Sequence, residues 1–121
     1  LLHLGDHGVE WVSDKRVVNA GKLPIIHGHE YPGGGGVNPA RWLYLRARSV
    51  AMCSHFHRTS EHHARNIKCQ HEAAWSIGCS CYLHPRWMPL NEWNLGFAFT
   101  DFDKSGEFVV ENKRVLGGKI V

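Results

Sequence analysis

Two His-x-His pairs carry the residue types in this sequence best suited to chemistry. One pair is His27 and His29, and the other is His55 and His57. Residues two apart in an extended strand point to the same side, so each pair would present two imidazoles on one face. A neutral imidazole is the commonest protein ligand for a metal ion, and ten histidines in 121 residues is a high content. The sequence therefore predicts a metal site.

Each pair directly follows an apolar run that reads as a strand, at residues 23–26 and 49–53. A helix is predicted between the two runs, at about 38–48, because Asn38 suits the N-cap and Pro39 suits the first helical position. If the strands are parallel neighbours joined by this helix, both histidine pairs lie at one carboxyl edge of a sheet. Open α/β sheets place their ligands at that edge.

The rest of the chain is predicted to be mostly strand, in short runs at 9–12, 67–71, 73–77, 96–102 and 107–112. The last two runs alternate around a turn and indicate a C-terminal β-hairpin. The polar segment 58–66 is interpreted as a surface loop over the site. These elements together predict an α+β domain, derived from the α/β class, that is mostly sheet with one crossover helix.

Length and composition limit the function classes. The 121 residues and the hydrophobic content of 43% predict a single domain, residues 1–121, with its own core. The formal charge of +3 is spread in ones and twos, so the sequence does not indicate a nucleic-acid-binding stripe. No apolar run approaches the roughly 20 residues that span a bilayer, and we expect a soluble, cytoplasmic protein with no membrane partner.

The four cysteines are Cys53, Cys69, Cys79 and Cys81, and they lack paired Cys-x-x-Cys spacing. We interpret them as free thiols of a reduced compartment rather than as disulfides. The Cys79-x-Cys81 spacing could also serve a metal ion, but spacing alone favours free thiols.

The histidine motifs resemble those of a known family. His27-Gly28-His29 followed by Ser54-His55-Phe56-His57 resembles the last two metal-binding motifs of the calcineurin-like metallophosphoesterases. The runs 55–62, 74–79 and 91–98 look like phage and prophage members of that family. The resemblance covers most of the chain from about residue 23 onward.

The resemblance implies a fold, an activity and a set of ligands. It implies half of a two-sheet metallophosphoesterase sandwich and hydrolysis of phosphate esters through a metal-activated hydroxide. His27 and His55 would hold one metal of a two-metal site, and His57 would hold the other. The expected cofactor is one or two ions of Zn²⁺ or Mn²⁺.

The chain also departs from that family's pattern. The Asp-x-His, Gly-Asp-x-x-Asp and Gly-Asn-His-Asp/Glu motifs of the family's first half do not occur here. Gly5-Asp6-His7 begins like the second of them but has Val9 where the next aspartate belongs, and Ser54 replaces the glycine of the last motif. The chain therefore resembles the C-terminal half of a metallophosphoesterase, a truncated domain.

The expected function is a metal-dependent phosphodiesterase acting on small or activated phosphodiesters. Zinc held by three histidines keeps a fourth position for water, whose pKa can fall to about 7. We expect Arg58 to hold the phosphate and His29, or else His62, His63 or His84, to protonate the leaving group. Further residues that could contribute to the site are Asp6, His7, His62, His63 and His84.

Other interpretations stay open. The chain could be a non-catalytic metal-binding domain remnant, or a nucleic-acid accessory protein of phage origin, against which the scattered charges weigh. Nucleic acid is otherwise expected only as a substrate. A half sandwich exposes a sheet edge and an apolar face, and both are usually covered by pairing, so we expect a homodimer.

Overall fold

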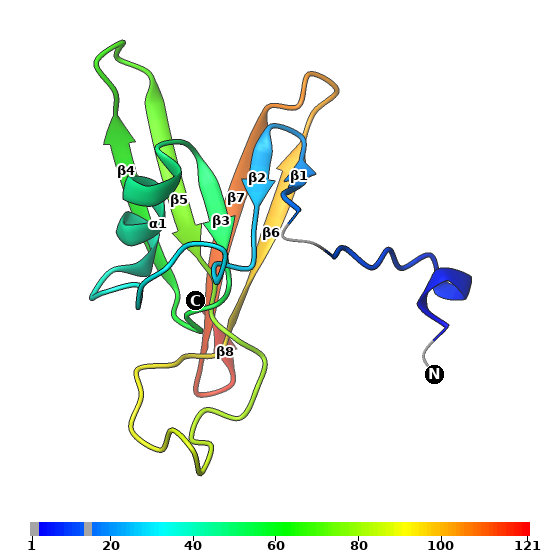
Figure 1. Cartoon of the computed structure of the whole chain (residues 1–121), viewed down its shortest axis with the longest axis vertical. Coiled ribbons are helices and arrows are strands. Elements are labelled where there is room, and N and C mark those ends of the chain that lie inside the picture. The colour runs from blue at the N-terminus through cyan, green and yellow to red at the C-terminus, as the bar shows by residue number, and fades with distance from the viewer. Residues whose placement is uncertain (1–2, 14–15) are drawn as a thin grey trace.

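The computed structural model of the chain describes residues 3–13 and 16–121. In this part the protein has one α-helix and two β-sheets, which confirms the predicted α+β class (Figure 1). The first sheet has the strand order β1-β2-β3-β5-β4 and the second has the order β6-β7-β8. The elements are the 3-10 helix η1 (Leu4–His7), β1 (Val18–Ala20), β2 (Leu23–Ile25), α1 (Pro39–Ala47), β3 (Ala51–Cys53), β4 (Ser60–Arg65), β5 (His71–Ser76), β6 (Gly96–Phe102), β7 (Phe108–Leu116) and β8 (Lys119–Ile120).

Strands β2 and β3 are parallel neighbours joined through α1, as the sequence predicted. Their register pairs Ile25 with Met52. Asn38 caps the helix by accepting a hydrogen bond from the Arg41 backbone N–H at 2.9 Å, and Pro39 occupies the first helical position. The helix ends at Arg48, which adopts a left-handed conformation with φ 52°. The predicted cap therefore fixes where the connection between the two strands begins.

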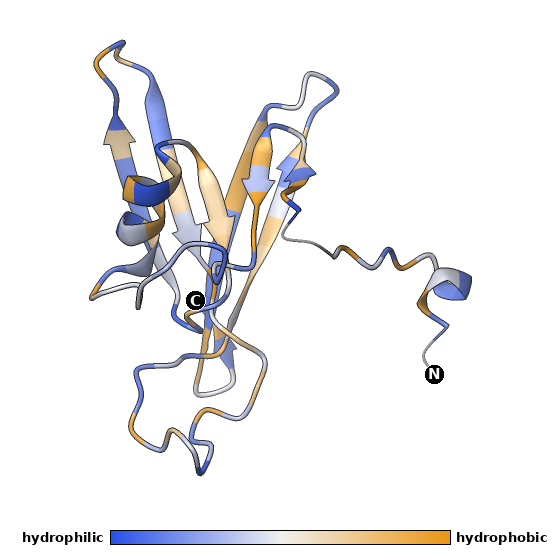
Figure 2. Ribbon diagram, in the orientation of Figure 1, coloured by the Kyte–Doolittle hydropathy of each residue, from blue (hydrophilic) through white to orange (hydrophobic). Residues whose placement is uncertain are grey.

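The five-stranded sheet lies between α1 and the three-stranded sheet, and each of its faces carries a core. Side chains alternate along β3, so Ala51 and Cys53 face the helix while Met52 faces the second sheet. The helix-side core contains Leu43, Ala51, Cys53 and Ala74. The core between the sheets contains Leu23, Met52, Ala73 and Trp75, packed against Ala98, Phe108 and Val110. In Figure 2, β3 and the first part of β7 carry hydrophobic colours.

Several segments differ from the prediction. Residues 58–66 were predicted as a surface loop, but β4 occupies Ser60–Arg65 and pairs antiparallel with β5. β4 is the edge strand of its sheet, so polar side chains are tolerated there. The run 67–71 is largely a turn rather than a strand, because the Asn66 side chain accepts hydrogen bonds from the backbone of Lys68 and Gln70. Residues 9–12 form no strand in the described structure.

The C-terminal hairpin is confirmed. β6 and β7 pair antiparallel from Gly96 with Arg114 to Phe102 with Phe108, and β8 extends the sheet beyond the predicted end. The helix α1 is nine residues long, and no helix in the described residues has the length and apolar character needed to cross a bilayer.

The helix cap gives a stability prediction. Replacing Asn38 with Ala removes the acceptor for the Arg41 N–H and is expected to lower the free energy of unfolding by about 1 kcal/mol. The matched control is Val37→Ala at the adjacent residue, which is 98% exposed and should change stability by less than about 0.5 kcal/mol. Urea denaturation measures both values, and equal stabilities for the two variants would contradict the capping role.

Candidate metal centre

The carboxyl edge of β2 and β3 brings His27 and His55 together. The His27 carbonyl accepts hydrogen bonds from the backbone N–H groups of both Ser54 and His55, at 3.0 and 2.9 Å. These bonds continue the parallel pairing beyond the strands and place the second histidine beside the first. The rings then meet, with the Nδ1 atom of His55 2.9 Å from the Nε2 atom of His27. The predicted convergence of imidazoles from two neighbouring strands is therefore present for this pair.

Gly28 permits this close approach. Its φ of 121° is unfavourable for residues with a side chain, and a Cβ atom at this position would lie 2.8 Å from the Cβ atom of His55. The same Cβ atom would also lie 3.3 Å from the Cβ atom of Cys53. A glycine between the two histidines of the first pair is thus required for the second pair to reach it.

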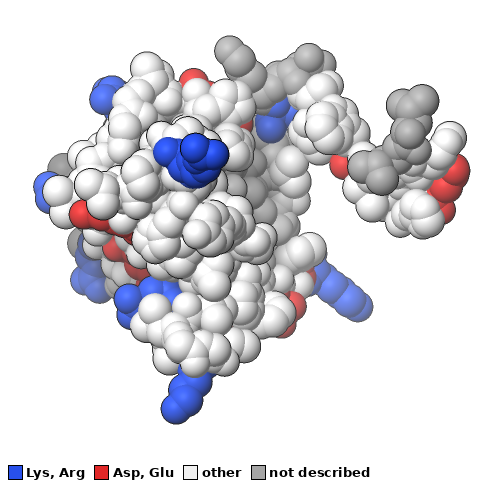
Figure 3. Space-filling model, turned by 90° about the horizontal axis from the view of Figure 1, so that it is seen from below, with Lys and Arg blue, Asp and Glu red and all other residues white. Residues whose placement is uncertain are grey.

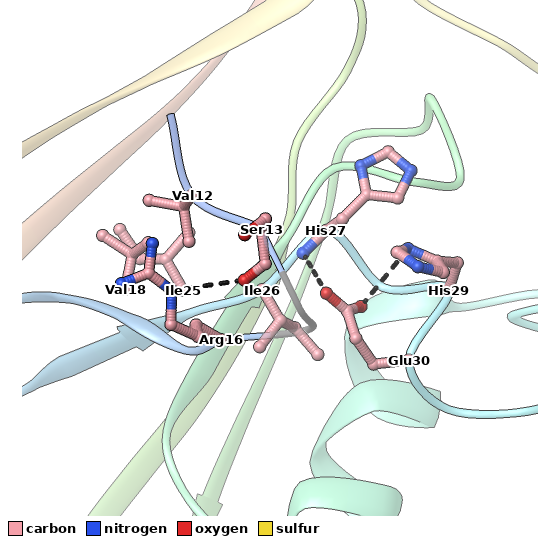
Figure 4. A pocket seen from close by; sticks show the side chains of 9 residues that line it. All are labelled: Val12, Ser13, Arg16, Val18, Ile25, Ile26, His27, His29 and Glu30. Carbon is pink, nitrogen blue, oxygen red and sulfur yellow. Dashed lines mark hydrogen bonds and ion pairs between the residues drawn. The ribbon is translucent and has the colours of Figure 1, made fainter. Parts of the chain in front are cut away.

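The Glu30 carboxylate holds the segment that carries His27 and His29. Its carboxylate accepts hydrogen bonds from the backbone N–H groups of His27 at 3.1 Å and Gly28 at 2.6 Å, and it lies 3.7 Å from the Nδ1 atom of His29 (Figure 4). Partial burial opposes ionisation, but these N–H donors, with the nearby charge of His29, hold the pKa of Glu30 below its usual value. The ring of His29 lies 5.2 Å from that of His27, measured between centroids. A carboxylate therefore lies among these imidazoles.

His57 points to a different set of groups. The extended geometry assumed for residues 55–57 is absent, because β3 ends at Cys53 and the His57 N–H closes a turn onto the Ser54 carbonyl at 3.2 Å. His57 itself has a left-handed φ of 55°. Its ring contacts the indole of Trp93, with centroids 4.4 Å apart. The turn thus separates the direction of His57 from that of His55.

His57 meets two cysteines that lie far along the chain. Its Nδ1 atom is 3.5 Å from the Sγ atom of Cys81. Ligand atoms of His57, Cys79 and Cys81 all lie within 4.8 Å of one another, and among the described residues this is the group of three that could hold a metal ion. Cys79 is buried and Cys81 is exposed. Burial raises the pKa of the remaining nearby thiol, Cys53, to about 12, so that thiol stays protonated.

The histidines at this edge favour the neutral form that binds metals. The pKa of His55 lies below its usual value because of partial desolvation, and then because of the charges that His27, His29 and His57 would carry. Desolvation followed by the charge of His27 lowers the pKa of His57 in the same way. Neutral imidazoles leave a ring nitrogen free for coordination.

Arg58 lies beside the histidines, but its guanidinium already has hydrogen-bond partners. Its guanidinium pairs with the carboxylate of Glu92 and donates to the Gly36 carbonyl, and only 17% of its side chain is exposed. An open groove of about 560 Å³ runs past it, with His55, His57 and Trp93 in its lining. Arg58 therefore borders a space large enough for a small ligand.

The five further candidates lie elsewhere on the fold. Asp6 and His7 lie on the exposed helix η1. His62 and His63 are consecutive residues within β4, so their side chains point to opposite sides of the sheet. His62 packs against the Tyr44 ring, and His63 faces Glu61 and Trp75. His84 is exposed in the segment after β5, with its Nδ1 atom 3.4 Å from the Pro89 carbonyl.

Cys53, Cys69, Cys79 and Cys81 are free thiols, as predicted, and the Cys79-x-Cys81 spacing was the one sequence signal for the cluster with His57. His57 is 22 and 24 residues earlier in the chain than Cys79 and Cys81, and only the fold shows that the three meet. The partly buried Glu30 beside the imidazoles was also missed, since a carboxylate one residue after a histidine carries no distinctive pattern.

Comparisons with protein-family models, with curated proteins and with solved structures gave no match to this chain. The resemblance to metallophosphoesterases therefore stays a prediction that rests on the sequence motifs.

Gly28 provides a test of the histidine contact. Gly28→Ala is expected to lower the free energy of unfolding by about 2 kcal/mol, because the new methyl group combines a strained φ with a clash against His55. Gly34→Ala is the matched control, since a Cβ atom there meets nothing within 4 Å. Urea denaturation of the two variants should separate them clearly, and a Gly28→Ala protein as stable as the control would show that the two strand ends do not approach this closely.

The lowered pKa of His55 predicts a pH dependence of stability. In the unfolded chain His55 has its usual pKa of 6.5, so on acidification the unfolded state binds this proton first. In metal-free protein the free energy of unfolding should therefore fall as the pH drops below about 6.5, until the lower pKa of the folded state is passed. His55→Gln should flatten this part of the profile measured by urea denaturation. A wild-type profile no steeper than that of His55→Gln would contradict the assignment.

Proposed function

We propose that the chain is a metal-dependent phosphodiesterase that acts on small or activated phosphodiesters. The observation that carries this proposal is the contact of His27 and His55 at the ends of two neighbouring parallel strands, with ring nitrogens 2.9 Å apart. Zinc–nitrogen bonds of about 2.0–2.1 Å place two imidazole nitrogens of one tetrahedral ion about 3.3 Å apart. Only a few tenths of an ångström separate the two arrangements, so the pair is nearly in position to share an ion.

The donor atoms favour zinc over manganese. His27 and His55 offer imidazole nitrogens, which suit zinc, whereas manganese prefers carboxylate and other oxygen ligands. Zinc held by His27 and His55 would supply Lewis acidity toward a phosphoryl oxygen and would lower the pKa of a bound water. The polypeptide itself supplies the imidazole rings, the partly buried Glu30 carboxylate that fixes the backbone of His27, and the groove beside them.

Two side chains are placed to act on the substrate. Arg58 borders the groove, and a phosphate oxygen could replace Glu92 or the Gly36 carbonyl as its partner. One guanidinium complements the single charge of a diester better than the double charge of a monoester. His29 has an exposed ring beside Glu30, which orients it, and from there it can donate a proton to the leaving alkoxide.

A second candidate function is a non-catalytic metal-binding domain. It is favoured by the group of His57, Cys79 and Cys81, whose thiols are strong zinc ligands but have no role in the proposed hydrolysis. A nucleic-acid-binding role has less support, since Figure 3 shows Lys and Arg side chains at separate places on the face in view rather than in one continuous stripe.

The hydrolytic proposal is tested by His55→Ala with His71→Ala as the matched control, because His71 is an exposed histidine at the start of β5. With zinc supplied, hydrolysis of an aryl phosphodiester should fall about 100-fold or more in His55→Ala and stay near wild type in the control. An aryl phosphomonoester should be the poorer substrate. Turnover that is unchanged in His55→Ala would overturn the proposal, and bound zinc without turnover in the wild type would support the second candidate.

We also propose that the protein is a homodimer. The outer face of the three-stranded sheet carries apolar side chains that a partner could cover, since Phe99 is 63% exposed and Val109 67% exposed on the face opposite the core. Sedimentation should give twice the chain mass of 13.7 kDa, and Phe99→Glu should shift it to the monomer. Val37→Glu, at an exposed loop position, is the control. A wild-type monomer at high concentration would exclude the dimer.

A further inference from the structure

We propose that His57, Cys79 and Cys81 form a zinc-thiolate site, separate from the His27–His55 pair, that fastens the long segment after β5 to the end of β3. The proposal does not depend on the hydrolytic function. It starts from the donor atoms, since two thiols and one imidazole within 4.8 Å are a set that zinc prefers and that manganese, magnesium and calcium do not.

The distance between His57 and Cys81 fits a shared ion. Zinc–sulfur bonds of about 2.3 Å and zinc–nitrogen bonds of about 2.0–2.1 Å place the two ligand atoms of one tetrahedral zinc about 3.6 Å apart. The Nδ1 atom of His57 and the Sγ atom of Cys81 are 3.5 Å apart. A thiol hydrogen-bonded to a ring nitrogen has a similar separation, so the proposal rests on a second thiol, that of Cys79, lying within 4.8 Å of the same two atoms.

The backbone fixes two of the three ligands through one residue. Asn94 donates its N–H to the His57 carbonyl at 3.0 Å, and its own carbonyl accepts the Cys79 N–H at 2.9 Å. The Gly96 N–H binds the Cys79 carbonyl at 3.0 Å and completes the support of Cys79. The Asn94 side chain in turn accepts the Thr59 N–H at 2.8 Å, just after His57. Ligands from two distant parts of the chain are therefore held at a set separation before any ion binds.

Local backbone strain also lies at this point. His57 holds a left-handed φ of 55°, which is uncommon for a residue with a side chain. Gly78, next to Cys79, could not carry a Cβ atom, since it would lie 2.6 Å from the Asn94 carbonyl oxygen. Together these constraints orient the imidazole of His57 and the buried thiol of Cys79 toward each other.

Charge balance favours the bound state. Binding Zn²⁺ would release one proton from each thiol to solvent, and the imidazole would bind through a neutral nitrogen. Two thiolates then cancel the two positive charges of the ion. A neutral complex is the least costly way to hold a dication beside a buried residue such as Cys79.

The site has a structural use. Residues 77–95, between β5 and β6, form no named strand or helix and expose large apolar side chains such as Tyr82, Trp87 and Leu90. Such a segment gains little from packing, so an added link between its first residues and the end of β3 restricts its freedom in the folded state. Three protein ligands leave the fourth position of the ion to water, and we expect the ion to stabilise this arrangement because it binds only where the fold brings the three ligands together.

The experiment uses the full chain, stripped of metal and kept reduced, with Co²⁺ as the spectroscopic probe. The wild type should bind cobalt with the near-ultraviolet charge-transfer absorption of thiolate ligands, and added Zn²⁺ should remove that absorption. Cys81→Ser, at an exposed position, should lose it, whereas Cys69→Ser, at another exposed cysteine, should keep it. His57→Ala should weaken binding of the probe. Persistence of the wild-type absorption in Cys81→Ser would overturn the proposal.

Thermal unfolding tests the structural role and separates it from hydrolysis. Excess Zn²⁺ should raise the Tm of the wild type and of Cys69→Ser by about 5 °C or more, and should raise that of Cys81→Ser by clearly less, because only the His27–His55 pair then remains to bind the ion. His55→Ala should keep the thiolate absorption while losing phosphodiester hydrolysis, so either proposal can fail alone. A zinc-induced rise in Tm that is equal in Cys81→Ser and in the wild type would contradict the fastening role.

Discussion

The parallel pairing of β2 with β3 is the constraint on which the rest of this structure depends. One carbonyl, that of His27, accepts two backbone N–H groups from the end of β3, and this places the side chains of His27 and His55 next to each other. The arrangement requires a residue without a Cβ atom at position 28, because the two chains approach there. The helix α1 and the core beneath it hold the two strands in register, so the imidazoles meet without needing an ion to bring them together.

Much of this framework could be predicted because its signals are local. The N-cap at Asn38, the proline after it and the two apolar runs specify a strand, a helix and a strand within about thirty residues. Strands joined in this way are parallel, and their ends share one edge. The β6–β7 hairpin was equally accessible, since alternating side chains flank a turn in which the Asp103 carboxylate accepts the Ser105 N–H at 2.7 Å.

The differences between the predicted and the observed structure have physical causes as well. β4 can have the polar composition of a loop because it is an edge strand that pairs on one side only. Its apolar partner β5 supplies the packing. The direction of His57 could not be read from His-x-His spacing, since that rule holds only while the strand continues and β3 ends at Cys53. The association of His57 with Cys79 and Cys81 depends on Asn94, which bonds the backbone of His57 and of Cys79 and is distant from these two residues in sequence. Contacts of this kind come from the fold rather than from any local pattern.

The two donor groups at this edge differ in the charge they would carry once occupied, and this difference suits them to different tasks. Zinc held by His57, Cys79 and Cys81 would form a neutral unit with its two thiolates, which fits the structural role proposed for it. Zinc held by the neutral rings of His27 and His55 keeps its double positive charge, of which the ionised Glu30 offsets one. Arg58 and Glu92 cancel each other nearby. The remaining single positive charge would complement the single negative charge of a phosphodiester, which is the substrate class of the proposed function.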